Sequence, residues 1–201
     1  MIRRGLITAL AALLPGAAFA HAFDTGRDAY GLFLEGAGVI LATPALILPL
    51  VAMGVALGLW RTEGLLAAWP GFLLGTLAGF ALAPVVPPAI LLVPLAFGLV
   101  IGVLAALLPL ERIAAALPIL AGLMGLAIVT AALEGHSFTE IGVLIRAGIF
   151  FAANLTLAIA AGVIRWVTER WPGEVTRIGG RVAASWLAAI LVLYLAFSLT
   201  A

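Results

Sequence analysis

The sequence contains no cysteine and no lysine, and only 9% of its 201 residues are charged. Without cysteine the chain offers no disulfide and no thiolate for metal binding or redox chemistry. A metal ion would have to be held by histidine, carboxylate or backbone oxygen. A net charge of +1 gives no electrostatic basis for binding nucleic acid. Since soluble domains have about a quarter of their residues charged, a water-soluble core is not expected.

Hydrophobic residues make up 65% of the chain and gather in six long apolar stretches. A helix needs about 20 apolar residues to cross the hydrocarbon core of a bilayer. The sequence therefore predicts an all-α integral membrane protein, a bundle of six transmembrane helices. The predicted spans are residues 36–60, 65–83, 88–108, 113–133, 141–164 and 182–200.

Residues 1–20 have the features of a secretory signal peptide. Arg3 and Arg4 precede a short apolar run at residues 5–14, and Ala18-Phe19-Ala20 forms a small-residue cleavage site. Cleavage is expected before His21, which leaves residues 21–201 as one six-helix transmembrane domain. The alternative is an uncleaved first helix. A cleaved signal indicates the bacterial inner membrane, with the mature N-terminus in the periplasm.

The arginines predict the same orientation independently. Alternate connections carry Arg61, then Arg112, then four arginines between residues 165 and 181. The other two connections, at residues 84–87 and 134–140, contain no arginine. Because cytoplasmic loops are rich in arginine and lysine, both mature termini are predicted to be periplasmic.

Glycine and proline indicate how the helices pack and bend. Glycines at four-residue spacing place one face of a helix close to a neighbouring backbone. They are Gly71, Gly75 and Gly79, Gly54 and Gly58, and Gly98 and Gly102. Prolines inside the predicted spans are expected to kink or break them, and Pro49, with Pro44 in the same span, points to a solute path. These prolines are Pro44, Pro49, Pro70, Pro94 and Pro118.

The few ionisable groups on the predicted outer face are mostly acidic. Histidine and carboxylate together suit nickel, cobalt, zinc or copper ions, and acidic groups concentrate cations. The candidate metal ligands are His21, Asp24, Glu35, Glu134, His136 and Glu140. The alternative is that these residues only solvate the periplasmic surface.

Within the fifth predicted span, Arg146 and Asn154 are candidates for a substrate path. An arginine inside a span is costly, so it pairs with a carboxylate such as Glu140 or Glu35, reaches the headgroups, or contacts the solute. No serine lies with a histidine inside a span, and there is no phosphate-binding or dinucleotide glycine motif. The sequence therefore predicts no enzyme and no cofactor.

Several segments resemble the HupE/UreJ family, bacterial permeases associated with nickel delivery to hydrogenase and urease. They are His21 after the signal, LVAMGVALGLW at residues 50–60, Val86-Pro87-Pro88, and residues 95–102 and 146–154. The resemblance implies a six-helix permease fold. The family's metal motifs are largely replaced: residues 42–49 contain no histidine or aspartate, and only His136 remains of H-x3-H-G-x-E. Ala132, Ser137 and Thr139 stand at the other positions of that motif, Glu140 comes one residue late, and the fifth-helix histidine falls near Leu157.

The function expected from these features is a permease that moves a small solute from the periplasm. The favoured class of solute is a divalent metal cation. One alternative is an accessory membrane subunit that assembles with a partner protein or with copies of itself. Another is an enzyme at the outer face that uses His136 and Glu140, although no third group is evident. In each case the lipid bilayer is a partner and nucleic acid is not.

Overall fold

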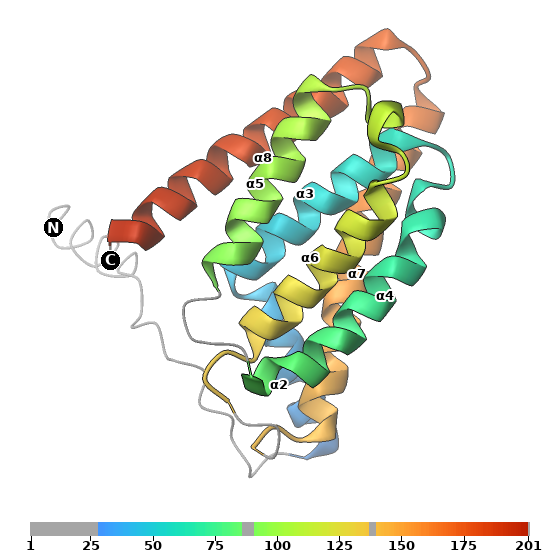
Figure 1. The fold of residues 1–201 in the computed structure, drawn as a ribbon. Coiled ribbons are helices and arrows are strands. Elements are labelled where there is room, and N and C mark those ends of the chain that lie inside the picture. Colours follow the sequence, from blue (N-terminus) through green and yellow to red (C-terminus); the bar gives the residue numbers. More distant parts are fainter. Residues whose placement is uncertain (1–27, 86–90, 137–139, 201) are drawn as a thin grey trace, which may run out of the picture.

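A computed structural model describes residues 28–85, 91–136 and 140–200. Within these ranges the chain is helical and contains no strand, which confirms the all-α prediction for this part. The predicted signal peptide lies outside the described residues. Two short 3-10 helices are η1 (Ala83–Val85) and η2 (Leu110–Ile113). The α-helices are α2 (Ala29–Leu41), α3 (Pro44–Trp60), α4 (Gly64–Leu82), α5 (Leu92–Leu107), α6 (Leu117–Ala132), α7 (Val143–Arg170) and α8 (Glu174–Thr200) (Figure 1).

Several of these helices could cross a membrane by their length and composition. Among the described residues three qualify, namely α4 extended by η1, α7 and α8, and a fourth if the bent pair α2–α3 counts as one span. Helices α5 and α6 are apolar but have 16 residues each. At about 1.5 Å per residue such a helix falls somewhat short of the ~30 Å hydrocarbon core. The described fold is thus consistent with a helical membrane protein that has three to four candidate spans.

The first predicted span, residues 36–60, is broken in the structure. Helix α2 ends at Leu41, α3 begins at Pro44, and the two are bent by 72°. Thr43 is extended, with φ −103° and ψ 105°, because a residue before proline avoids the helical region. Pro44 therefore starts a helix, where its missing N–H costs nothing, instead of kinking one.

The other prolines divide between helix starts and interiors. Pro118 stands in the first turn of α6 and Pro94 is the third residue of α5. Only Pro49 and Pro70 lie well inside their helices, in α3 and α4. The prediction that these prolines kink or break spans is therefore confirmed at Pro44, where the first span is bent by 72°, and wrong for Pro118, whose position favours helix initiation.

Helix α3 forms the centre of the bundle and α8 lies at its edge (Figure 1). The helices associate mainly as the pairs α4–α6, α2–α7, α3–α7, α5–α8 and α3–α5. In α3, 12 of 17 residues are buried, whereas in α8 only four of 27 are. Those four form a narrow stripe of mostly small residues: Gly180, Ala184, Ala188 and Leu191. The remaining surface of α8 is largely apolar and exposed, as expected for a helix that faces lipid.

Glycines lie at the points where helix backbones approach most closely. In the α4–α6 pair, a methyl group added to Gly71 or Gly75 would overlap the carbonyl oxygen of Pro118 or Gly122. Such close packing increases van der Waals contact, which drives helix association where no hydrophobic effect operates. The other glycines of the predicted faces also abut neighbours: Gly54 faces Ala160, Gly58 faces Ala161, Gly79 faces Val129, Gly98 faces Pro49 and Gly102 faces Ala188.

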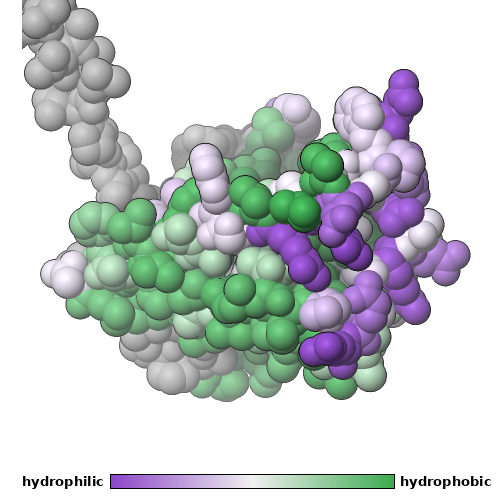
Figure 2. Space-filling view, turned by 90° about the horizontal axis from the view of Figure 1, so that it is seen from above, coloured by the Kyte–Doolittle hydropathy of each residue, from purple (hydrophilic) through white to green (hydrophobic). Residues whose placement is uncertain are grey.

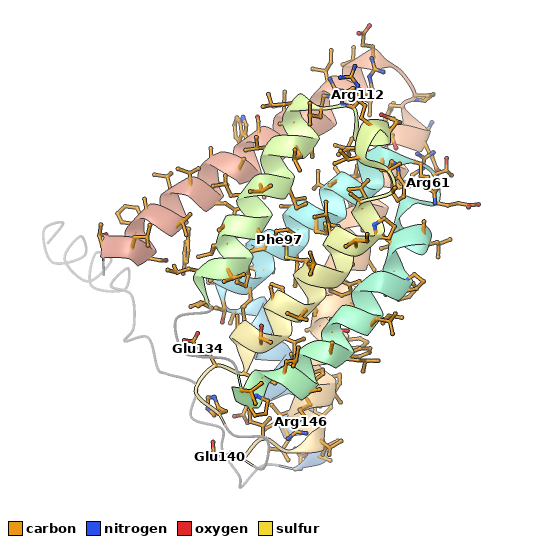
Figure 3. The ribbon with its side chains drawn as sticks, viewed as in Figure 1. Arg61, Phe97, Arg112, Glu134, Glu140 and Arg146 are labelled. Carbon is orange, nitrogen blue, oxygen red and sulfur yellow. The ribbon has the colours of Figure 1, made fainter. Side chains whose placement is uncertain are left out.

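Charged residues separate to the two ends of the bundle. Figure 2, a view from above, shows hydrophilic residues gathered together beside a broad hydrophobic surface. Figure 3 shows Arg61 and Arg112 at one end and Glu134, Glu140 and Arg146 at the other. We call the second the acidic end. We call the first the arginine end; it comprises the connections that carry Arg61 and Arg112, the last turns of α7 and the first turns of α8. The predicted connection between residues 165 and 181 is therefore mostly helical: Arg165 and Arg170 lie in α7, and Arg177 and Arg181 lie in α8.

Candidate functional site

The acidic end contains most of the predicted binding residues that the structure describes. Glu134 and His136 follow α6, while Glu140 and Arg146 lie on either side of the start of α7 (Figure 3). Glu35 comes near the same end because its neighbour Gly36 packs directly on Ile145. Two further predicted ligands, His21 and Asp24, lie outside the described residues.

The imidazole of His136 is oriented by the main chain. Its Nδ1 lies 3.0 Å from the carbonyl oxygen of Glu134. Gly135, with φ 78°, adopts the left-handed conformation that makes this turn, which a glycine accepts without strain. Because a carbonyl oxygen only accepts, Nδ1 is the donor in this hydrogen bond, and in that tautomer Nε2 is the nitrogen with the lone pair. Metal-binding histidines are commonly oriented by such a hydrogen bond on the other ring nitrogen.

His136 and Arg146 line one small crevice between the ends of α4 and α7. Its volume is about 10 Å³, and its walls include Phe80, Ala83 and Leu133. A single water molecule needs at least about 10–15 Å³, so packing almost fills this crevice. Arg146 is half-buried here. The arginine thus belongs to the same site as the histidine, at the acidic end.

The described residues do not assemble a complete metal site. Within residues 28–85, 91–136 and 140–200, no three histidine, aspartate or glutamate side chains come close enough to hold a metal ion. A site centred on His136 would need further ligands from water, from the backbone or from segments such as the one with His21 and Asp24.

Asn154 forms a polar bridge between two helices. Trp69 Nε1 in α4 donates a hydrogen bond of 2.8 Å to Asn154 Oδ1. Asn154 Nδ2 in turn donates to the Phe150 carbonyl oxygen, also at 2.8 Å. The asparagine is buried, and α4 and α7 share few other contacts. The main role of Asn154 in this conformation is therefore to connect α4 to α7.

The residues of the predicted substrate path do not converge. Asn154 and Arg146 line different hollows, one between α4 and α7 and the other at the acidic end. Pro49 is buried against Gly98 of α5. A path along α3 and α7 would require the contacts of Pro49 and Asn154 to open.

Two apolar grooves follow the flanks of α7. One of about 340 Å³ lies beside the bridge between Trp69 and Asn154. The other, of about 380 Å³, is lined by α3, α7 and Leu41, and includes Thr156. Thr156 is 7% exposed, and its hydroxyl has no hydrogen-bond partner in the described part of the chain. The nearly all-hydrocarbon walls suit lipid chains better than a charged solute.

The bridge between Trp69 and Asn154 leads to a measurable coupling. A double-mutant cycle with Trp69→Phe and Asn154→Ala should give an interaction free energy of about 0.6–1.7 kcal/mol, between the average and the largest values measured for hydrogen bonds between membrane helices. Unfolding in mixed detergent micelles, followed by circular dichroism, measures the four variants. Strictly additive effects would show that the bridge does not stabilise the α4–α7 association.

No feature of the sequence indicates that Trp69 is the partner of Asn154. The two residues are 85 positions apart, and no spacing rule joins them. A buried asparagine in a span requires a partner, and an indole N–H is a suitable donor. That argument alone would not have chosen among the five tryptophans of the chain.

Comparison with protein-family models, with curated proteins and with solved structures finds no match.

Proposed function

We propose that the chain is a bacterial inner-membrane permease for a small solute, with a divalent cation of the nickel or cobalt type as the expected class. In this hypothesis residues 1–20 are a cleaved signal peptide, and the six crossings are α2 with α3, α4, α5, α6, α7 and α8. Both mature termini and the acidic end would face the periplasm. The gathering of six of the seven described arginines at one end supports the orientation. The resemblance to the HupE/UreJ family supports the substrate class.

The orientation of His136 is the observation that carries the cation hypothesis. Because Nδ1 donates to the Glu134 carbonyl oxygen, Nε2 is the nitrogen that would coordinate the ion. Imidazole nitrogen is a good ligand for nickel, cobalt, zinc and copper. Glu134 and Glu140 flank the histidine in the same connection and would raise the local cation concentration. Glu35, with His21 and Asp24 from the mature N-terminal segment, would supply further ligands.

Arg146 would determine on which side of the histidine the ion binds. Its guanidinium stays charged and lines the crevice on the α4–α7 side of His136. A cation is repelled from that side, so the carboxylates would hold it on the outer side. The break between α2 and α3 is a second supporting feature, because discontinuous helices are common in transporters.

Metal uptake by the full chain in liposomes tests this function. Changing His136→Ala and Glu140→Gln together should lower the initial rate of Ni²⁺ or Co²⁺ uptake at least about tenfold, as expected when metal ligands are lost. Glu63→Gln, at the arginine end, is the matched control and should leave the rate unchanged. Equal uptake by the double variant and the control would show that the acidic end does not bind the transported ion.

An accessory membrane subunit is the second candidate function. It is favoured by the separate surroundings of Arg146, Asn154 and Pro49, each of which lies in its own packed environment. A stoichiometric partner that co-purifies in mild detergent, together with no uptake by the chain alone, would select this function over transport. Neither hypothesis assigns the chain a catalytic role.

A further inference from the structure

A cavity of about 270 Å³ lies at the arginine end, between the start of α8, the end of α3 and the α5–α6 connection. Arg177 and Arg181 line it on the α8 side, and Glu111 lines it from η2. Its apolar wall includes Leu59, Leu108 and Pro109. The cavity thus combines charged groups with hydrocarbon, as a site for an amphiphilic molecule requires.

The sequence of α8 explains why both arginines reach the cavity. They are four positions apart in a helix and therefore lie on the same side of it. Gly180, between them, comes so close to Leu59 that an added methyl group would overlap the leucine side chain. This contact lays the start of α8 on the end of α3. Arg177 also lies in the first turn of α8, where the helix dipole favours an anion.

The positive charge in the cavity is poorly compensated. Half-buried Arg181 forms no hydrogen bond or ion pair with any residue that the structure describes. Arg177 approaches Glu174 at 3.7 Å, but both side chains are exposed, and such pairs contribute little. Glu111 pairs with neither arginine, in contrast to the bond of 2.6 Å between Arg165 and Glu169 nearby. Two guanidinium groups and one carboxylate therefore leave the cavity suited to an anion.

The aromatic residues near the cavity indicate that it lies close to the level of lipid headgroups. Tryptophans cluster at this end: Arg61 stacks over Trp60 at 4.3 Å, and Trp166 meets Trp171 edge to face at 5.5 Å. Tryptophan prefers the boundary between hydrocarbon and headgroups. A phosphate at this level would be adjacent to the acyl chains of the same lipid.

We propose that this cavity binds the phosphate group of an anionic phospholipid. The planar guanidinium groups of Arg177 and Arg181 donate to the phosphate oxygens, and the wall of Leu59, Leu108 and Pro109 contacts the glycerol and the first acyl carbons. Arginine suits this role because its fork of N–H groups matches phosphate geometry. The site is separate from the acidic end and does not depend on the transport hypothesis.

Lipid binding to the purified full chain, measured by native mass spectrometry in mild detergent, tests the assignment. Phosphatidylglycerol should bind more tightly than phosphatidylcholine, and Arg177→Gln with Arg181→Gln should weaken phosphatidylglycerol binding by about tenfold or more, as loss of charge-assisted hydrogen bonds predicts. The control, Arg112→Gln with Arg170→Gln, removes the same charge at the same end from residues outside the cavity. It should change the affinity by less than about twofold, because exposed charges are screened.

Two more arms make the outcome decisive. Arg177→Lys with Arg181→Lys keeps the positive charge but removes the forked N–H groups of the guanidinium, so the lipid affinity should fall in part. An undiminished affinity would contradict paired hydrogen bonds from each guanidinium to the phosphate. Inorganic phosphate at millimolar concentration should not displace the lipid, and displacement would show that free phosphate is the ligand. An equal loss in the control variant would show that general electrostatic attraction, not this cavity, holds the lipid.

Discussion

Replacing Gly75 by alanine should destabilise the protein by about 1–3 kcal/mol or more, the usual cost of overpacking a tight interior. The added methyl group would overlap the carbonyl oxygen of Gly122 in α6. Neither helix can yield easily, because a methyl group on Gly122 would in turn lie 3.0 Å from the Gly71 carbonyl oxygen. Gly71 itself abuts Pro118. If α4 and α6 moved apart to accommodate the methyl group at Gly75, the close contacts at Gly71 and Gly122 would therefore be lost as well.

The same substitution at Gly162 in α7 is the matched control. No atom outside its own helix surroundings lies within 4 Å of the position that a Cβ would occupy there. Alanine is favoured over glycine in a helix by about 0.5–1 kcal/mol, so Gly162→Ala should raise the stability slightly. Denaturant unfolding in detergent micelles, followed by circular dichroism, compares the two variants. Shifts of the same sign and size would mean that backbone contact between α4 and α6 does not hold the bundle together.

The glycine pattern shows what spacing reveals and what it leaves open. The four-residue repeat of Gly71, Gly75 and Gly79 is enough to predict the packing face of α4 from the sequence. It did not identify α6 as the partner, because Gly122 and Gly125 of α6 are three residues apart. The packing face of a helix follows from the spacing of its residues, whereas the helix that packs on this face depends on how all the helices of the bundle pack together.

The break before α3 shows why hydropathy alone cannot reveal the bend within the first predicted span. An average over residues 36–60 measures apolar character and ignores backbone hydrogen bonding. Thr43 and Pro44 carried the local signal, since the residue before proline avoids the helical region and proline favours a helix start. The expectation that Pro44 kinks or breaks the span therefore rests on these two residues and not on the apolar runs at either side. The bend of 72° follows from the backbone, not from polarity.

The acidic end was foreseen as a region but not in its contacts. The arginine-free connection at residues 134–140 indicated that Glu134, His136 and Glu140 lie together. That Arg146 shares a crevice with His136 depends on how the ends of α4, α6 and α7 pack together, which no pattern in the sequence encodes. The attachment of Asn154 to Trp69 is of the same kind, because it joins helices distant in the chain.

An arginine at Leu74 should largely prevent stable insertion of α4 into a membrane. Leu74 lies near the middle of Gly64–Leu82 and is 69% exposed. In lipid, an arginine at the centre of a span costs about 2.5–3.5 kcal/mol on insertion scales. In water, the same exposed substitution would change stability by no more than about 0.5 kcal/mol. The yield of folded protein in the membrane fraction, together with protection from protease, measures the effect.

Leu66→Arg is the control that distinguishes the effect of depth in the membrane from the effect of the leucine-to-arginine change itself. Leu66 is 62% exposed, but it is the third residue of α4 and lies close to the arginine end, where an added guanidinium reaches the headgroups. The substitutions are chemically identical and both positions are exposed, so only the surrounding medium distinguishes them. A large loss for Leu74→Arg beside a small one for Leu66→Arg would show that the exposed leucines of α4 face hydrocarbon. Equal tolerance at both positions would show that this surface is in water, and the membrane assignment would then be wrong.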